Sequence, residues 1–135
     1  MQVPSEITYH QVSKTLELAY KDGFRCCLSA EYLRISSPSA EVQGHTPEQA
    51  QLPVGKKNVR IVDIEPVGRY AIKIVFSDGH DSGYYDWDYL RVLGLEQAER
   101  WQRYLDQLKV KGASRDPDDP RNDIFKPIAK KGCRH

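Results

Sequence analysis

Histidine is the residue type of this chain best suited to catalysis or metal binding, and its spacing argues against an iron site. His10, His45 and His80 lie in or beside expected loops, and His135 ends the chain. An iron-dependent oxygenase binds its metal through two histidines and a carboxylate, the first histidine lying two residues before the carboxylate. His80 is instead followed directly by Asp81, and no carboxylate lies two residues after His45. The chain is also too short for the oxygenase barrel, so we expect no catalytic iron.

The serines and glycines form no recognisable catalytic or phosphate-binding motif. Ser37 and Ser39 flank Pro38, but no Gly-x-Ser-x-Gly elbow is present to expose either hydroxyl as a nucleophile. The Gly-Lys-Lys run at 55–57 lacks the spacing of a phosphate-binding loop. These serines are better explained as turn formers. We therefore expect that the chain by itself is not an enzyme.

The three cysteines lack the pattern of a disulfide framework or a metal site. Their number is odd, and Cys26 and Cys27 are adjacent, while Cys133 lies near the end of the chain. Consecutive residues of a strand face opposite sides, so Cys26 and Cys27 are not expected to bind one metal ion. We expect one buried cysteine and one exposed thiol in this pair.

Two loop segments, residues 32–45 and 78–87, combine polar, turn-forming and aromatic side chains. Binding residues concentrate in loops that a rigid scaffold positions, so we expect a binding surface here. A simpler interpretation stays open, in which Asp78 and His80 only fix a turn through side-chain bonds to the backbone. The candidate surface residues are Arg34, Ser37, Ser39, Glu41, His45, Asp78, His80, Ser82, Tyr84, Tyr85 and Trp87.

Composition and charge limit the classes of partner. The chain has 135 residues, of which 39% are hydrophobic, and 20 Lys and Arg against 19 Asp and Glu give a net charge of +1. That balance argues against a general nucleic-acid or membrane-surface binder, whose affinity comes from concentrated positive charge. No apolar run is long enough to span a bilayer, and the first residues do not resemble a signal peptide. We expect a cytoplasmic protein.

Alternating apolar residues predict a fold rich in antiparallel strands. The dipeptide Asp22-Gly23 suits the tight turn of a hairpin between two of these strands. Residues 36–58 carry few apolar side chains and predict a long irregular connection. The expected strand segments are 7–12, 15–20, 24–28, 59–64 and 70–76.

Helices are expected at three places. Ser29 and Asp86 each precede a short helical turn and are suited to cap it, and Gly94 is expected to end the second turn. From residue 95 to residue 111 the apolar side chains recur at spacings of three and four, which predicts one long helix. The sequence therefore predicts a small β-rich α+β domain with a C-terminal helix.

The last 24 residues differ in character from the rest and predict a flexible tail. From residue 115 onward the chain carries six positive and four negative charges and three prolines. Such a segment has too little apolar surface to repay the entropy of ordering. We predict a domain over residues 1–111 followed by a disordered charged tail over residues 112–135.

The two polar segments, 32–45 and 78–87, together with the expected strand 70–76, resemble the sequence of a known family. The similar stretches are Leu33-Arg34, Ser37-Pro38-Ser39-Ala40-Glu41-Val42, and Tyr70-Ala71-Ile72-x-Ile74-x-Phe76-x-Asp78-Gly79-His80-x-Ser82-Gly83, with Trp87 and Leu90. Over roughly residues 5–95 the chain resembles a bacterial family of small proteins related to the N-terminal domain of gamma-butyrobetaine hydroxylase and trimethyllysine hydroxylase. A similar domain is found at the C-terminus of some P-loop iron–sulfur carrier proteins. The resemblance implies a small β-rich α+β domain.

The resemblance also implies where a zinc ion binds in the hydroxylases, through three cysteines and one histidine. The cysteine positions correspond here to Ser37, Ser39 and Val42, and the histidine corresponds to His80. Structural zinc requires a closed set of Cys and His ligands, which neutral hydroxyls do not replace. We therefore expect no zinc and no other cofactor here. His80 is expected to bond the serine hydroxyls across the same pair of loops.

Taken together, these features predict a non-catalytic protein-binding or adaptor domain with an unknown protein partner. The alternative is an accessory factor in iron or iron–sulfur metabolism, with metal bound outside the lost zinc site and an iron–sulfur carrier as a possible partner. The resemblance to fused carriers motivates this alternative. Neither nucleic acid nor a membrane is expected as a partner.

Overall fold

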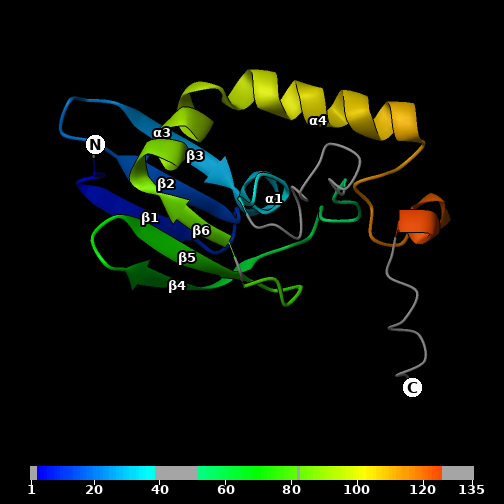
Figure 1. Ribbon diagram of the computed structural model, residues 1–135, viewed down its shortest axis with the longest axis horizontal. Coiled ribbons are helices and arrows are strands. Elements are labelled where there is room, and N and C mark those ends of the chain that lie inside the picture. The colour runs from blue at the N-terminus through cyan, green and yellow to red at the C-terminus, as the bar shows by residue number, and fades with distance from the viewer. Residues whose placement is uncertain (1–2, 39–51, 82, 126–135) are drawn as a thin grey trace.

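The computed structural model describes residues 3–38, 52–81 and 83–125, arranged as two antiparallel sheets with helices packed against them (Figure 1). The predicted α+β class, with antiparallel strands and a long helix near the C-terminus, is confirmed. The elements are β1 Glu6–His10, β2 Thr15–Ala19, β3 Arg25–Ser29, α1 Ala30–Ile35, β4 Ile61–Val67, β5 Ala71–Phe76, β6 Gly83–Asp86, α3 Trp87–Leu95, α4 Gln97–Lys111 and a 3-10 helix at Pro120–Phe125.

The first sheet buries one face, as the alternation of its apolar residues predicts. β2 lies between β1 and β3, and the register places Leu18 beside Ile7 and Cys26. Leu16, Leu18 and Cys26 are buried, whereas Cys27 lies on the outer face and is exposed. The prediction of one buried and one exposed cysteine is confirmed.

The second sheet contributes to the same core and contains one strand that the sequence did not predict. β5 lies between β4 and β6 and buries Ile72, Ile74 and Phe76. β6 lies inside the segment 78–87, which was expected to be a loop. This strand has only four residues, and its one large inward-facing side chain is Tyr85. Four residues are too few for an alternation of buried and exposed side chains to be recognised in the sequence.

The short helices begin where the sequence predicts them, because side chains cap their first turns. The Ser29 hydroxyl accepts a hydrogen bond from Tyr32 N at 3.0 Å, and Asp86 Oδ1 accepts one from Tyr89 N at 2.7 Å. α4 ends at Gly112, whose φ of 70° lies in the left-handed region that favours glycine. Of the helices in the described ranges, none has the length and apolar character needed to cross a membrane.

Gly94 permits close packing between α3 and β3, whereas the sequence predicted that it would end the helix. α3 continues through Leu95. A Cβ atom added at Gly94 would lie 2.7 Å from Cys26 Sγ and 3.3 Å from Phe24 Cζ. The absence of a side chain therefore sets how closely α3 approaches the buried face of the first sheet.

An ion pair holds the start of the predicted tail against the domain. Arg115 donates from Nε and Nη2 to the two carboxylate oxygens of Glu31 at 2.7 and 2.8 Å. The Glu31 side chain is only 7% exposed, and the Arg115 guanidinium lies over the Trp101 ring at 5.1 Å from its centroid. A two-point pair of this kind fixes direction as well as distance. It joins the segment after α4 to the short helix α1.

A buried asparagine completes this attachment, and we call residues 113–122 the strap. Asn122 is fully buried, accepts a hydrogen bond from Ser114 N and donates one to Asp116 O, both at 2.8 Å. Gly55 N donates to Ser114 O at 3.0 Å. Paired charges and a buried amide thus take the place of apolar contacts over residues 113–122, inside the segment 112–135 for which a disordered charged tail stays a prediction. Residues 126–135 of that tail lie outside the described residues.

Replacing Gly94 by alanine tests the packing of α3 on β3. We expect Gly94→Ala to lower the free energy of unfolding by about 1–3 kcal/mol, as overpacked sites do. The change is informative because alanine has the better helix propensity, by about 1 kcal/mol, and should stabilise a helix without a clash. Denaturant unfolding measures the effect.

Cys26→Ala supplies the control, because it removes the sulfur that the new methyl group would meet. The variant that carries both Gly94→Ala and Cys26→Ala should lose less free energy of unfolding than the two single losses added together. A stabilised Gly94→Ala variant, or strictly additive effects, would contradict the proposed contact.

Candidate functional site

The two polar segments meet at a buried contact between Ser37 and His80. Ser37 follows α1, His80 follows β5, and Ser37 Oγ lies 2.9 Å from His80 Nε2. The residues are only 1% and 7% exposed. The hydrogen bond that the sequence predicts between His80 and a serine hydroxyl is therefore present.

Tyr85 and Gly83 form the wall of this contact on the β6 side. The Tyr85 hydroxyl donates a hydrogen bond to Leu33 O. Burial raises the pKa of Tyr85, while a hydrogen bond with Ser37 opposes the rise. A Cβ at Gly83 would lie 2.7 Å from Ser37 Oγ, so glycine is needed for the serine to approach β6 this closely. The pocket for the Ser37 hydroxyl is thus formed by three separate elements.

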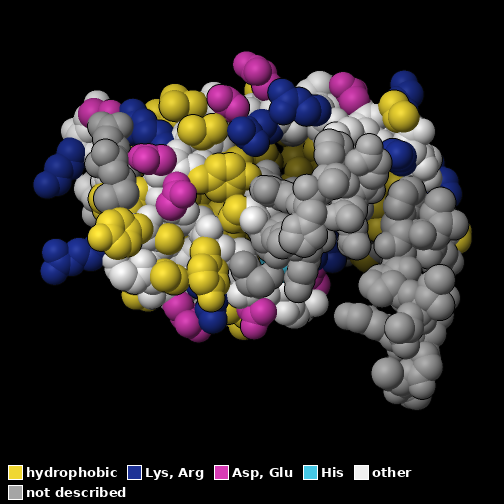
Figure 2. All heavy atoms as spheres, in the orientation of Figure 1, with side chains coloured by type: hydrophobic (Ala, Val, Ile, Leu, Met, Phe, Trp, Pro, Cys, Tyr) yellow, Lys and Arg dark blue, Asp and Glu magenta, His cyan; other side chains and the backbone are white. Residues whose placement is uncertain are grey.

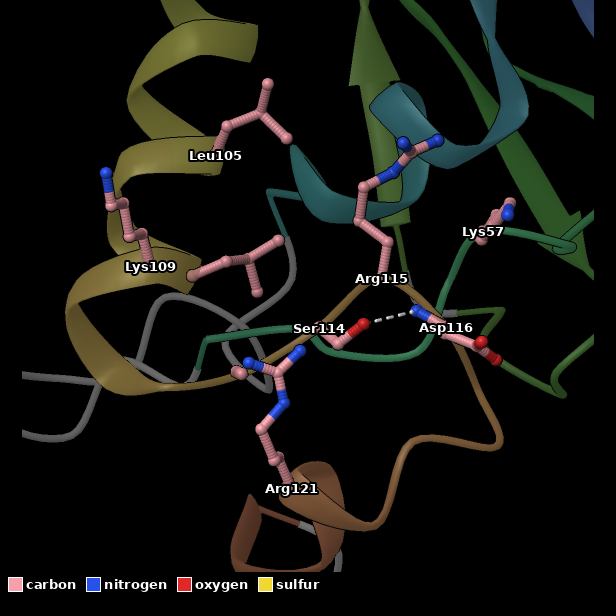
Figure 3. A pocket seen from close by; sticks show the side chains of 9 residues that line it. Lys57, Leu105, Lys109, Ser114, Arg115, Asp116 and Arg121 are labelled. Atoms are coloured by element: carbon pink, nitrogen blue, oxygen red, sulfur yellow. Dashed lines mark hydrogen bonds between the residues drawn. The ribbon is translucent and has the colours of Figure 1, made fainter.

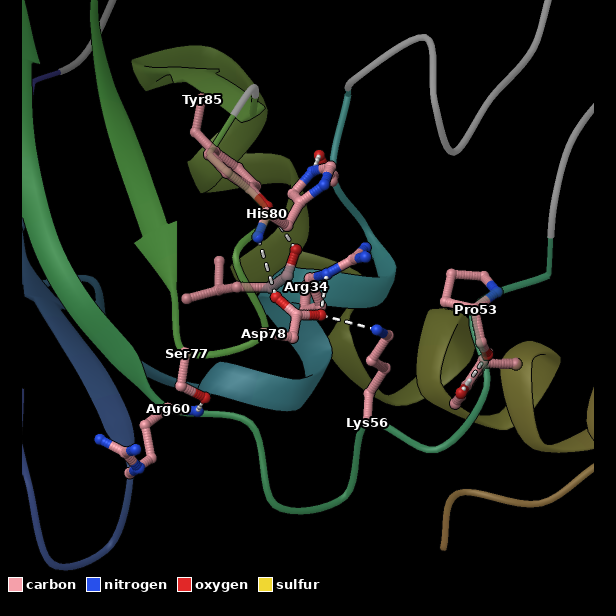
Figure 4. Close-up of polar contacts among 11 residues, drawn as sticks. Arg34, Pro53, Lys56, Arg60, Ser77, Asp78, His80 and Tyr85 are labelled. Atoms are coloured by element: carbon pink, nitrogen blue, oxygen red, sulfur yellow. Dashed lines mark hydrogen bonds and ion pairs between the residues drawn. The ribbon is translucent and has the colours of Figure 1, made fainter. Parts of the chain in front are cut away.

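A second polar contact lies beside the first and centres on Asp78 (Figure 4). Asp78 Oδ2 accepts hydrogen bonds from Arg34 Nε at 2.9 Å and Lys56 Nζ at 2.6 Å, while Oδ1 accepts one from His80 N at 3.1 Å. Burial by itself disfavours the charged carboxylate, but Lys56, Arg34 and the His80 amide outweigh it and lower the pKa of Asp78 to about 2. Asp78 is therefore ionised at neutral pH and joins the turn after β5 to helix α1 and to the loop before β4.

Ser37, His80 and Asp78 are the residue types of a hydrolase triad, but their arrangement is different. Asp78 bonds the backbone amide of His80, and no hydrogen bond between described residues joins Asp78 to the imidazole. A catalytic carboxylate would orient the ring itself. The Ser37 hydroxyl is also almost fully buried, out of reach of a substrate. The geometry suits a clamp between loops and does not suit nucleophilic catalysis.

The described residues do not fit the zinc site implied by the resemblance to the hydroxylases. Two ligands of one tetrahedral zinc, each about 2.0–2.1 Å from the metal, lie about 3.3 Å apart. Ser37 Oγ and His80 Nε2 are 2.9 Å apart and bonded to each other. In the parts of the chain that the structure describes, no three His, Cys, Asp or Glu side chains are grouped to bind a metal ion. Ser39 and Val42 lie outside the described residues.

The predicted surface is divided by the structure. Tyr85 has no exposed area and Trp87 is only 8% exposed, with its Nε1 donating to Arg69 O at 2.8 Å. The expectation that both rings form a contact surface is therefore wrong, because they belong to the core. Tyr84 alone of the three aromatic residues is exposed. The predicted residues that lie outside the described ones are Ser39, Glu41, His45 and Ser82.

Sequence reasoning missed Lys56, the second cation on Asp78. It lies 22 positions before Asp78, in a loop without apolar periodicity, and was considered only as part of a phosphate-binding motif. Loop-to-loop contacts of this kind leave no regular signal in one sequence. The nearest usable signal is Asp78 itself, which follows a buried strand and can anchor neighbouring loops.

Comparisons with known proteins agree with this fold. The family described as gamma-butyrobetaine hydroxylase-like, N-terminal, matches residues 7–91. One protein structure solved by NMR is 47% identical with a TM-score of 0.77, covering 95% of this chain and 98% of that one. A second NMR structure is 43% identical with a TM-score of 0.74, covering 87% of each chain.

A crystal structure is also similar. It is a protein of unknown function from the DUF971 family of Acidithiobacillus ferrooxidans, 37% identical with a TM-score of 0.57, and the match covers 67% of this chain and 91% of that one. No curated protein matches the chain. The two chains share the arrangement of their strands and helices.

Removing either partner of the buried contact should destabilise the fold. We expect Ser37→Ala and His80→Ala each to lower the free energy of unfolding by about 1–3 kcal/mol, because the hydrogen bond between them is lost at a buried position. The double variant should lose less than the sum of the two. Denaturant unfolding measures all three, with the exposed Ser13→Ala as the control. Additive or negligible losses would show that the two side chains do not depend on each other.

The lowered pKa of Asp78 predicts a stability that depends on pH. The folded pKa of about 2 lies below the ordinary 3.8, so the contribution of Asp78 is complete above about pH 4 and is lost as the pH falls towards 2. The difference in stability between wild type and Asp78→Asn should therefore shrink over that range, by about 1–2 kcal/mol. Unfolding curves between pH 2 and 7 test this, with Glu99→Gln on α4 as the control. A difference that stays constant with pH would contradict the ion-pair assignment.

Proposed function

We propose that this chain, which belongs to the gamma-butyrobetaine hydroxylase-like N-terminal family, is a non-catalytic protein-binding module. Its contact surface is the outer face of the second sheet around Tyr84. The observation that carries this proposal is that Tyr84 is 55% exposed on a strand whose next residue is fully buried. Tyrosine is enriched at protein interfaces, because one ring covers much area at a low cost in conformational entropy.

The surroundings of Tyr84 suit recognition of a protein. The register places Tyr84 opposite Lys73, which lies opposite Glu65 and forms an ion pair with it at 3.4 Å. Hydrophobic side chains gather over β6 and α3 on the side of the molecule seen in Figure 2. Apolar positions mixed with charged ones are typical of non-obligate interfaces. By strand alternation and register, the outer face comprises Asp63, Glu65, Val67, Lys73, Val75, Tyr84 and Asp86, with the buried Ala71 between them.

The Ser37–His80 contact supports a non-catalytic role for the domain. Both side chains are buried and bonded to each other, and Asp78 is bonded to two cations and a backbone amide. These groups hold three loops in place behind the sheet. Ser37, Asp78 and His80, which the sequence suggests as binding residues, thus hold the loops in place. In this proposal the partner binds the opposite, outer face of the second sheet.

The alternative role in iron or iron–sulfur metabolism rests on the resemblance to domains fused to iron–sulfur carriers. Cys27 is the exposed thiol among the described cysteines, but no three potential metal ligands are grouped there or elsewhere in the described ranges. An iron–sulfur carrier would therefore enter as a protein partner of the outer face. A photo-crosslinking amino acid placed on this face would capture such a carrier as well.

A photo-crosslinking amino acid at position 84 tests the proposed surface. We expect it to form a covalent adduct with a specific protein in the native cell, and the same amino acid at Val12, which is 100% exposed in the turn between β1 and β2, should not. Mass spectrometry of the adduct identifies the partner. Identical adducts from both positions, or none from position 84, would contradict the proposal.

Tyr84→Ala separates binding from folding. The side chain is exposed, so the change should alter the free energy of unfolding by no more than about 0.5 kcal/mol. Affinity for the identified partner should fall by about tenfold or more, as for an aromatic residue at the centre of an interface. A loss of affinity that accompanies a loss of stability would assign Tyr84 to the fold.

A further inference from the structure

A shallow, open pocket of about 410 Å³ lies where α4 ends, bordered on one side by the strap (Figure 3). Its floor is apolar and comes from Leu105, Leu108 and Ala113. Leu108 and Ala113 are 5% and 6% exposed and belong to the small core beneath α4. This pocket is formed by none of the outer-face residues around Tyr84, so an inference about it goes beyond the proposed function.

The walls of the pocket are unusually rich in positive charge for this chain. Lys57 from the loop before β4, Lys109 from α4, and Arg115 and Arg121 from the strap line it, against a single carboxylate, Asp116. The whole chain has a net charge of only +1, so four cations around one hollow are a local concentration. Positive side chains from several segments create a field that attracts an acidic ligand.

Two of these cations are engaged by the fold and two are not. Arg115 is held by Glu31 and Arg121 by Asp119, at 2.7 and 2.8 Å. Lys57 and Lys109 are exposed and form no ion pair with any described residue. Long lysine side chains can reach a ligand without breaking an existing contact. Lys57 and Lys109 are therefore the groups available to an incoming carboxylate.

The groups that could repel an anion each accept a hydrogen bond within the protein, which reduces their repulsion without cancelling the charge of Asp116. The last carbonyls of α4 carry the negative end of the helix dipole, but Leu108 O accepts from Ala113 N at 2.8 Å and Lys109 O accepts from Gly112 N at 3.3 Å. Asp116 Oδ1 accepts a hydrogen bond from Asp118 N at 2.9 Å. The strap is held by Asn122, so the shape of the pocket is formed before any ligand arrives. A preformed wall lowers the entropic cost of binding.

We infer that this pocket binds an acidic polypeptide segment, with an apolar side chain on the Leu105–Leu108 floor and flanking carboxylates at Lys57 and Lys109. The combination of an apolar floor and free ammonium groups distinguishes this ligand from a free phosphate, which needs no apolar surface. It also distinguishes it from a basic or neutral peptide, which would leave the lysines unpaired.

A titration followed by NMR tests the inference on the full chain. The probe is a synthetic peptide of sequence Glu-Asp-Leu-Phe-Glu-Asp, added at low salt to isotope-labelled protein. Backbone amides between residues 105 and 121 should shift saturably, and the affinity should fall by about tenfold or more when the salt concentration is raised from 50 to 300 mM. The peptide Lys-Lys-Leu-Phe-Lys-Lys should cause no saturable shift.

Charge reversal at the two free lysines supplies the decisive variant. Lys57→Glu combined with Lys109→Glu should weaken binding of the acidic peptide by about tenfold or more. The pair Lys21→Glu and Arg103→Glu changes the net charge equally at exposed positions outside the pocket lining and should leave most of the affinity intact. Unfolding curves confirm that both variants fold.

Three results would overturn the inference. The first is an absence of saturable shifts between residues 105 and 121 in the wild-type protein. The second is equal weakening by the two charge-reversed pairs, which would indicate attraction to net charge alone. The third is a response to inorganic phosphate as strong as the response to the peptide, which would assign the pocket to a small anion.

Discussion

The buried contact between Ser37 and His80 is the constraint on which the loop side of this domain depends. It fixes the end of α1 against the turn that follows β5, two points separated by 43 positions in the chain. Asp78 extends the same junction to the loop before β4 through Lys56 and returns to α1 through Arg34. Polar contacts therefore position three segments without regular structure: those after α1, before β4 and after β5. These contacts fix where the loops run relative to the two sheets.

Such a junction is sensitive because its groups are removed from water. A buried polar group without a partner costs about 1–3 kcal/mol, while a satisfied one contributes only about 1 kcal/mol net. The contact therefore selects one arrangement of the loops more than it adds to stability. In the hydroxylases that the chain resembles, a zinc ion is implied at the same position. Here a hydroxyl and an imidazole bond each other directly, so the protein atoms themselves close the junction.

The sequence predicts those features that depend on local chemistry. The alternation of Leu16 and Leu18, the capping residues Ser29 and Asp86, and the opposite environments of Cys26 and Cys27 all follow from side-chain spacing. These signals act within a few residues, so no knowledge of the tertiary structure is needed. The residues that the resemblance placed together, Ser37 and His80, are in contact.

The features that the sequence did not predict depend on pairing between distant segments. β6 is strand because β5 lies beside it, and its Gly83 is required by the approach of Ser37. The strap looks disordered by composition, but its charge at Arg115 is matched by Glu31, 84 positions earlier. Composition counts charges and cannot show which of them are paired. Tyr85 is found in the core for a related reason: it faces inward only because β6 pairs with β5, and that pairing cannot be read from the sequence.

Hydrogen exchange in the presence of a strong chelator tests the central claim, that protein side chains alone close the junction. The informative amides are Phe76 N, which donates to His80 O at 2.9 Å, and His80 N, which donates to Asp78. The account predicts that both remain protected to the same degree as amides in the centre of β5 when metal is removed, and that Ser37→Ala reduces their protection first. Loss of protection at these amides on addition of the chelator, with β5 unchanged, would show that a metal ion holds the loops and would contradict the account.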